Sequence, residues 1–232
     1  MRPITNTIPK PLVKINNKSI IDYSIEKLQK ISSINKIIIN GFYLSEEIQK
    51  HIKNLNDDRI FFSQEIEKIE TGGGILFAKD KIDFEKPLLT INGDVFWQDL
   101  NNISDIELIS ETWNKFQKDG KCDILLGVKK TDEFFGYDKN SNGDFNLKSD
   151  GNLEKISNTK MSHAFTGLQI INPKILLEDF VKEFGDCFSL SKIYYALINN
   201  SQRIKAVELK GRYFHIGNVE AISQTEKLIN QN

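Results

Sequence analysis

Hydrophobic residues follow two alternating patterns along the first half of the chain. Short, uniformly apolar runs predict buried strands, whereas apolar residues three and four positions apart predict amphipathic helices. The predicted strands cover residues 36–40, 60–62, 87–92 and 123–128, and the predicted helices cover 20–28, 45–55, with Ser45 at a capped start, and 105–118. A further short helix is expected at the glycines of 72–74. Short strands that alternate with helices are typical of βαβ units, so the pattern predicts an α/β fold with a parallel sheet.

The pattern changes after Val128. The turn residues Ser149-Asp150-Gly151 separate two short segments, 144–147 and 152–156, which predicts a β-hairpin. Strands are then expected at 164–171, 204–209 and 213–216, and helices from Pro173, at 190–199 after Ser189 as N-cap, and at 219–229. Because no linker, repeat or low-complexity tract interrupts the sequence, it predicts one domain over residues 1–232 with an elaborated second half.

Composition excludes several classes of protein. Of the 232 residues, 39% are hydrophobic, which is too many for a disordered chain. Lys and Arg total 31 against 32 for Asp and Glu, and this balance argues against a binder of nucleic acid or of membrane surfaces. With no apolar run of about 18 residues and no signal-peptide core, we expect a cytoplasmic protein. Cys122 and Cys187 lie outside any CxxC motif, so we expect reduced thiols without a disulfide or a metal.

Prolines surround Lys10 near the start of the sequence. Pro3, Pro9 and Pro11 are expected to hold this stretch extended and to fix where the lysine points. A rigidly presented ammonium group suits phosphate binding. A proline-rich loop with a solvated lysine is the alternative, and the segment taken alone favours that alternative.

Glycines at 72–74 follow Thr71 at the start of a predicted helix. Gly72 and Gly73 would let a ligand approach the bare backbone, and exposed N–H groups at a helix start favour anionic or polar acceptors. Glycines also serve ordinary turns, so this signal is weak by itself.

Two polar residues follow predicted strands. Asp94, in Asn92-Gly93-Asp94, stands where a catalytic carboxylate would lie, because ligands bind at the carboxyl ends of strands in open α/β sheets. A single carboxylate suits Mg²⁺, which takes one or two protein carboxylates and completes its shell with phosphates and water. A turn without any ligand is equally compatible. His215 lies among aromatic residues at the end of another predicted strand, where a structural role is the more common one.

Together these segments resemble the sugar-1-phosphate nucleotidyltransferases. Arg2-Pro3-Ile4-Thr5 and Pro9-Lys10-Pro11-Leu12-Val13 match the second half of the family's opening pattern, R-x-R/M-R-P-x-T-x-x-x-P-K-P-L-V. Ser63-Gln64-Glu65 and Glu70-Thr71-Gly72-Gly73-Gly74-Ile75 match the S-x-E…E-T-G-G-G-I pattern of one branch. That branch comprises the N-acetylmuramate-1-phosphate uridylyltransferase-like enzymes of cell-wall sugar recycling. Later segments follow in its order and extend the resemblance from residue 2 to about residue 229: Asn92-Gly93-Asp94-Val95, Gly143-Asp144-Phe145, Phe165-Thr166-Gly167 and Phe188-Ser189-Leu190.

The resemblance implies a Rossmann-like, mixed but mainly parallel sheet of the nucleotide-diphospho-sugar transferase type. Residues 1–128 would form the nucleotide-binding half and residues 129–232 the sugar-binding half. A sugar 1-phosphate would attack the α-phosphorus of an NTP, with UTP as the expected donor, and pyrophosphate would leave. Lys10, on the NTP phosphates, and Asp94, on Mg²⁺, would be the catalytic residues. The nucleotide would also contact Glu65, Thr71, Gly72, Gly73 and Asn92, and the sugar phosphate would contact Asp144, Thr166, Gly167 and His215.

Two departures from the family pattern are visible. His215 stands where many members have a second metal-binding aspartate, and Mg²⁺ prefers oxygen ligands. Either His215 contacts substrate, or the metal rests on Asp94 and substrate oxygens alone. The family's first strand and its glycine-rich loop, L-A-A-G-x-G-x-R, are expected to be missing ahead of Arg2, through a misplaced start codon or through degeneration of the gene.

Other functions stay open on the sequence alone. They are a mannose-1-phosphate guanylyltransferase, a non-catalytic relative that binds a nucleotide or nucleotide sugar and, more remotely, a glycosyltransferase. The sequence does not indicate an oligomeric state.

Overall fold

The computed structural model describes residues 1–118, 120, 122–138, 140–155, 159–200 and 203–230. The chain forms two compact units. The first contains Met1–Asp83, Phe184–Ser189 and Ile216–Asn232, and the second contains Phe84–Glu183 and Leu190–His215. The bounds of these units differ from the two functional halves expected from the sequence, because two later segments join the first unit. The assignment of residues 1–128 to the nucleotide and of residues 129–232 to the sugar stays a prediction.

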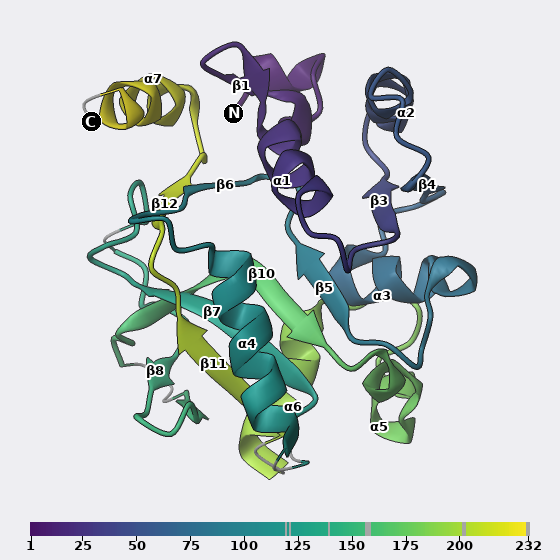
Figure 1. Ribbon diagram of the computed structural model, residues 1–232, viewed down its shortest axis with the longest axis vertical. Coiled ribbons are helices and arrows are strands. Elements are labelled where there is room, and N and C mark those ends of the chain that lie inside the picture. The colour runs from purple at the N-terminus through teal and green to yellow at the C-terminus, as the bar shows by residue number, and fades with distance from the viewer. Residues whose placement is uncertain (119, 121, 139, 156–158, 201–202, 231–232) are drawn as a thin grey trace. The chain divides into compact units, whose positions relative to one another are not determined.

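The first unit contains a parallel strand pair (Figure 1). β3 (Ile37–Gly41) lies beside β4 (Ile60–Gln64), and Ile37 is the partner of Ile60. The helices of this unit are α1 (Ile20–Gln29), α2 (Ser45–Lys53), α3 (Glu70–Phe77) and α7 (Val219–Ile229). A short hairpin of β1 (Lys14–Ile15) and β2 (Lys18–Ser19) precedes α1.

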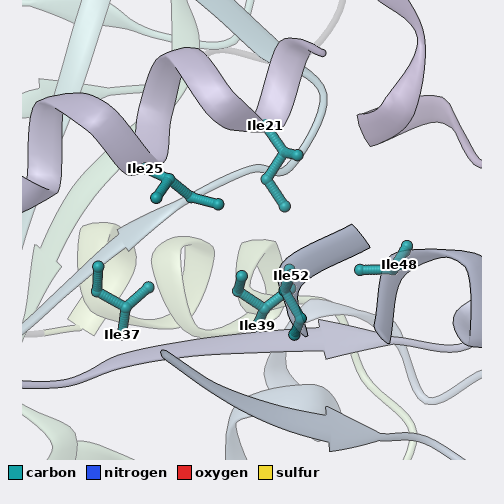
Figure 2. Close-up of a cluster of buried hydrophobic side chains, with 6 residues drawn as sticks. All are labelled: Ile21, Ile25, Ile37, Ile39, Ile48 and Ile52. Carbon is teal, nitrogen blue, oxygen red and sulfur yellow. The ribbon is translucent and has the colours of Figure 1, made fainter. Parts of the chain in front are cut away.

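Isoleucines make the core of the first unit. Figure 2 shows side chains of α1 pointing toward those of β3, with α2 beside them. The buried cluster, called the isoleucine cluster below, contains Ile21, Ile25, Ile37, Ile39, Ile48 and Ile52. Burial of each such side chain stabilises the fold by roughly 1.5–3 kcal/mol. Since Ile37 and Ile39 face this cluster, strand alternation directs Ile38 and Asn40 to the other face of β3.

The local backbone structure of the first unit differs from the sequence prediction in two places. The stretch around Lys10 is not extended: it forms two 3-10 turns, Ile4–Asn6 and Lys10–Leu12. The φ that proline imposes fits the first turn of a helix as well as an extended chain, so the prolines did not decide between them. α2 begins after Leu44, whose φ is 50°, and Ser45 lies inside the helix without a capping side chain before it.

The second unit contains a four-stranded sheet in the order β11-β7-β10-β5. Its strands are β11 (Ile204–Glu208), β7 (Ile124–Lys130), β10 (His163–Ile171) and β5 (Leu88–Ile91), and α4 (Asp105–Lys118) lies over it in Figure 1. β11 runs parallel to β7, whereas β10 runs antiparallel to both β7 and β5. The predicted α/β class is confirmed, but the expectation of a mainly parallel sheet needs correction. The insertion of β10 between β5 and β7 makes the sheet mixed.

Smaller elements complete the second unit. β6 (Val95–Gln98) pairs antiparallel with β12 (Arg212–His215), and β8 (Asn146–Leu147) pairs with β9 (Leu153–Glu154). The β8/β9 pair confirms the predicted hairpin, although Ile156 lies outside the described residues. Pro173 begins a 3-10 turn, Pro173–Leu177, which precedes α5 (Asp179–Lys182) and α6 (Leu190–Asn200). In the described part of the chain, no helix combines the length and apolar composition needed to cross a bilayer.

Candidate functional site

The turn that carries Asp94 is attached to Gly167. The backbone N–H of Asn92 donates to the Gly167 carbonyl at 2.9 Å, and the N–H of Val95 donates to the Asn92 carbonyl at 3.1 Å. Gly167 has φ +89°, and a Cβ there would lie 2.5 Å from Cγ2 of Val95. Only glycine suits this backbone angle and this close approach. The structure therefore brings together two segments that the sequence assigned to different substrates.

His215 lies on the strand next to the one that follows Asp94. In the β6/β12 ladder, His215 is the Cα partner of Val95, and its N–H donates to the Phe135 carbonyl at 2.8 Å. His215 is exposed, whereas Phe96 and Phe214, the pair before it in the ladder, are buried with ring centroids 5.4 Å apart. The aromatic pair fixes the ladder and leaves the end that carries His215 in contact with solvent.

Two of the predicted sugar-phosphate residues have mainly structural contacts. Thr166 is 1% exposed, and its hydroxyl donates to the Gly127 carbonyl at 2.8 Å. This hydroxyl supports the irregular part of β10, where the register shifts between Phe165 and Gln169. Contact of Thr166 with a sugar phosphate stays a prediction. Asp144 is half-buried, and its Oδ2 accepts the N–H of Phe165 at 2.8 Å. Its role toward a sugar phosphate stays a prediction.

Asp105 is a buried carboxylate that sequence reasoning missed. It is 0% exposed and accepts backbone N–H groups from Lys210 at 2.8 Å and Gly211 at 2.9 Å. Burial raises the pKa of Asp105, and these two hydrogen bonds oppose the shift. In the sequence it looks like an ordinary acidic residue in the first turn of a helix, which gave no signal of its partners.

In the first unit, Lys10 begins the second 3-10 turn. The N–H of Val13 donates to the Lys10 carbonyl at 3.1 Å, and Leu12 packs against the isoleucine cluster. The turn is thereby anchored to the core, while the Lys10 residue itself is half-buried. The turn that carries Lys10 is thus held at its backbone, although its conformation differs from the predicted one. Binding of phosphate by Lys10 stays a prediction.

The glycines of α3 pack against the segment Phe184–Ser189. The Phe188 carbonyl accepts the N–H of Gly72 at 2.8 Å and that of Gly73 at 3.2 Å. A Cβ on Gly72 would lie 2.2 Å from the Phe188 ring, and one on Gly73 would lie 2.2 Å from the Asp186 carbonyl oxygen. The expectation that these N–H groups are open to a ligand is therefore wrong, because both donate hydrogen bonds to the Phe188 carbonyl. Contact of Thr71, Gly72 and Gly73 with a nucleotide stays a prediction.

Glu65 lies where β4 ends, against the third glycine of α3. A Cβ on Gly74 would lie 2.7 Å from Oε1 of Glu65 and 2.9 Å from Nδ2 of Asn40. The Asn40 amide donates to the Gly74 carbonyl at 2.7 Å and also hydrogen bonds the Glu65 carboxyl. Burial raises the pKa of Glu65, and the hydrogen bond from Asn40 opposes that shift. Asn40 is a second residue that the sequence gave no reason to select.

The donor set around Asp94 suits a metal whose shell is completed by substrate. Among the described residues, no group of three or more His, Cys, Asp or Glu side chains is placed to hold a metal ion. Asp94, a half-buried residue in the turn between β5 and β6, offers one carboxylate. Mg²⁺ commonly binds through one or two protein carboxylates, substrate phosphates and water. The single carboxylate of Asp94 therefore fits a Mg²⁺ ion that is bound together with substrate, and does not fit a metal ion that is held by protein ligands alone.

Comparison with known proteins gives one family match and several relatives. A model of the nucleotidyl transferase family matches residues 1–232. The chain is 25% identical over 227 residues to the N-acetylmuramate alpha-1-phosphate uridylyltransferase of Caulobacter vibrioides, and the match covers 95% of this chain and 88% of that protein. It is 26% identical over 220 residues to the mannose-1-phosphate guanylyltransferase catalytic subunit beta of Xenopus tropicalis, covering 94% of this chain and 58% of that protein.

A solved structure shares the fold. The crystal structure of HddC from Yersinia pseudotuberculosis complexed with GMP-PN superposes with a TM-score of 0.69 and 20% sequence identity. The match covers 99% of this chain and 93% of that chain. It confirms the predicted fold class over nearly the whole sequence.

Proposed function

Because the chain belongs to the nucleotidyl transferase family, we propose that it transfers a nucleotidyl group from a nucleoside triphosphate, by preference UTP, to a sugar 1-phosphate. An oxygen of the sugar phosphate forms a bond to the α-phosphorus. The bond from that phosphorus to the oxygen shared with the β-phosphate breaks, and pyrophosphate leaves with the bonding electrons. The products are a nucleotide-diphosphate sugar and pyrophosphate.

The attachment of the Asp94 turn to Gly167 is the observation that supports this proposal most. The hydrogen bond from Asn92 to Gly167 holds a carboxylate-bearing turn against the strand assigned to the sugar phosphate. In-line transfer between two phosphates needs both substrates to be positioned and their charge to be neutralised, more than it needs covalent help. A rigid turn that carries one carboxylate meets that need.

Lys10 and Glu65 are the charged residues proposed for the nucleotide. The Lys10 ammonium would bind the triphosphate, since a lysine on an anchored turn acts as a fixed point charge. Glu65 would accept a hydrogen bond from the base. Thr71, Gly72 and Gly73 would also contact the nucleotide. These roles rest on the resemblance and on the placement of Glu65 against α3.

Mg²⁺ belongs to the proposal as the cofactor, held by Asp94. When bound, it would neutralise negative charge on the phosphates. His215, next to the strand that follows Asp94, would contact the sugar phosphate as a hydrogen-bond donor, because an imidazole is a poor ligand for Mg²⁺.

The choice of UTP rests on the relative from C. vibrioides, of which the match covers 88%. That protein is an N-acetylmuramate alpha-1-phosphate uridylyltransferase, so we propose a hexosamine-type 1-phosphate as the acceptor. A second candidate is mannose-1-phosphate guanylyltransfer, supported by 26% identity over 94% of this chain to the enzyme from X. tropicalis.

A matrix of substrates tests the proposal. The purified chain is incubated with Mg²⁺ and UTP, GTP or CTP, each paired with N-acetylmuramate 1-phosphate, N-acetylglucosamine 1-phosphate or mannose 1-phosphate. Pyrophosphate is followed by a coupled assay and the nucleotide sugar by mass spectrometry. We expect both products with UTP and a hexosamine 1-phosphate, and neither without an acceptor. Faster reaction of GTP with mannose 1-phosphate would favour the second candidate, and absence of products in every pair would refute nucleotidyl transfer.

A further inference from the structure

Asn40 and Glu65 lie at the carboxyl ends of two neighbouring parallel strands. Asn40 is the partner of Ser63 in the β3/β4 ladder, and the N–H of Glu65 donates to the Gly41 carbonyl at 2.9 Å. Because Ile39 faces the isoleucine cluster, alternation places Asn40 on the opposite face of β3, toward α3. Two polar side chains from adjacent strand ends therefore meet the same helix.

The Asn40 amide connects the Glu65 carboxyl to α3. Its Nδ2 donates to the Gly74 carbonyl at 2.7 Å. Hydrogen bonding by the same amide is one of the causes that set the pKa of the Glu65 carboxyl. Both groups lie close to Gly74, since a Cβ there would lie 2.7 Å from Oε1 of Glu65 and 2.9 Å from Nδ2 of Asn40. The Glu65 carboxyl thus lies beside a neutral donor and a glycine that leaves no space for a side chain.

A neutral partner has an electrostatic consequence for Glu65. Burial raises the pKa of this carboxyl, and the hydrogen bond from Asn40 lowers it. The nearby cation in the sequence, Lys68, pairs instead with Glu70 at 2.8 Å. Asn40 therefore favours the ionised form of Glu65 without cancelling its negative charge, which leaves a strong acceptor for an N–H group.

We propose that Asn40 is a positioning residue for the nucleotide, because it holds the Glu65 carboxylate where it can accept a ring N–H of the base. This inference rests on the proposed function, which assigns Glu65 to the nucleotide. Uracil and guanine carry a ring N–H, whereas the corresponding ring nitrogen of cytosine is an acceptor that a carboxylate would repel. The pair selects UTP or GTP over CTP.

Equilibrium binding tests the proposal without requiring turnover. Dissociation constants of UTP and CTP, each with Mg²⁺, are measured by calorimetry for the wild type, Asn40→Leu and Ser63→Ala. We expect Asn40→Leu to weaken UTP binding about tenfold and CTP binding much less. A tenfold change is the size expected when one hydrogen bond to a charged group is lost. Ser63→Ala is the matched control at the partner position, since its buried hydroxyl has no hydrogen-bond partner among the described residues, and we expect no change.

A titration separates positioning from a general structural role. The Glu65 carboxyl is followed by carbon-13 NMR in the ligand-free protein, and we expect its pKa to rise in Asn40→Leu because an opposing hydrogen bond is lost. UTP binding should then weaken at a higher pH than in the wild type. Asn40→Ser serves the same purpose if the leucine variant does not fold.

The outcomes distinguish this inference from the proposed function. Equal weakening of UTP and CTP, or an unchanged Glu65 titration, would overturn the positioning role even if the wild type turns over. Selective weakening of UTP with no turnover in any substrate pair would support the positioning role and count against nucleotidyl transfer.

Discussion

The buried carboxylate of Asp105 accepts a hydrogen bond from the backbone N–H of Gly211, 106 positions later in the chain. The same side chain accepts the N–H of Lys210 at 2.8 Å. Gly211 fits tightly, since a Cβ there would lie 2.6 Å from Oδ2 of Asp105. The contact joins the start of α4 to the turn before β12, and β12 carries His215 to its place beside the Asp94 turn.

Removal of this carboxylate should destabilise the protein. We expect Asp105→Ala to lower the free energy of unfolding by at least about 2 kcal/mol, because two backbone N–H groups lose their acceptor. Urea unfolding followed by circular dichroism measures the change. Glu107→Ala, at an exposed position of the same helix, is the control and should stay within about 0.5 kcal/mol of the wild type. Equal effects of the two variants would show that the Asp105 contacts do not stabilise the fold.

The raised pKa of Asp105 predicts a pH dependence with a definite sign. A carboxyl whose pKa is higher in the folded protein stabilises the fold below its unfolded pKa of about 3.9, and this contribution is lost as pH rises through the folded pKa. Asparagine does not titrate. The unfolding free energy of the wild type should therefore fall relative to that of Asp105→Asn as pH rises above about 4. Urea unfolding of both proteins between about pH 4 and pH 7 measures the difference, and parallel curves would contradict the assignment.

The close contact of Gly72 with Phe188 predicts coupling between two substitutions. A methyl group 2.2 Å from the Phe188 ring overlaps it, so Gly72→Ala should cost about 1–3 kcal/mol despite the better helix propensity of alanine. Phe188→Leu should relieve part of that cost. Chemical unfolding of both single variants and of the double variant gives the coupling energy, which we expect to reach about 1 kcal/mol. Additive effects would mean that α3 and the Phe188 segment move apart without strain.

Asp94 is predicted to act on turnover and not on stability. Asp94→Asn keeps the shape of the side chain but removes the charge proposed to hold Mg²⁺, so we expect kcat to fall about 100-fold or more. Pyrophosphate release at saturating substrate measures the effect, and thermal melting should be unchanged. Asp132→Asn, an exposed position of the same unit, is the control and should keep full activity. Wild-type turnover in Asp94→Asn would remove Asp94 from the site.

Lys10 is predicted to act on the affinity for the triphosphate. Lys10→Ala should raise KM for the NTP about tenfold or more, the loss of a charge-assisted hydrogen bond, with little change in KM for the sugar phosphate. Initial rates over a grid of both substrates separate the two constants. Lys14→Ala, an exposed lysine in β1, is the matched control for removal of one positive charge. A similar rise in both variants would point to a nonspecific effect of charge.

The strongest sequence signals were local ones. Apolar spacing in α1 and α4 and uniform apolar runs in β3 and β7 predicted these elements within one or two residues. β1 and β2 were not predicted, because two-residue strands carry no periodicity. β6 was not predicted, because it follows the Asp94 turn without a break. The motifs around Lys10 and the glycines of α3 indicated the family that the comparison confirmed.

The sequence by itself determined the fold class and the family, and it singled out Lys10, Glu65 and Asp94 as candidates, because periodicity and motif spacing are properties of neighbouring residues. The tertiary structure decided which groups those residues meet. The Phe188 carbonyl accepts the N–H groups of Gly72 and Gly73, the Asn40 amide donates to the Gly74 carbonyl, and the Gly167 carbonyl accepts the N–H of Asn92 in the Asp94 turn. Each of these contacts joins segments more than 30 positions apart in the sequence, and chain folding alone brings such partners within hydrogen-bonding distance.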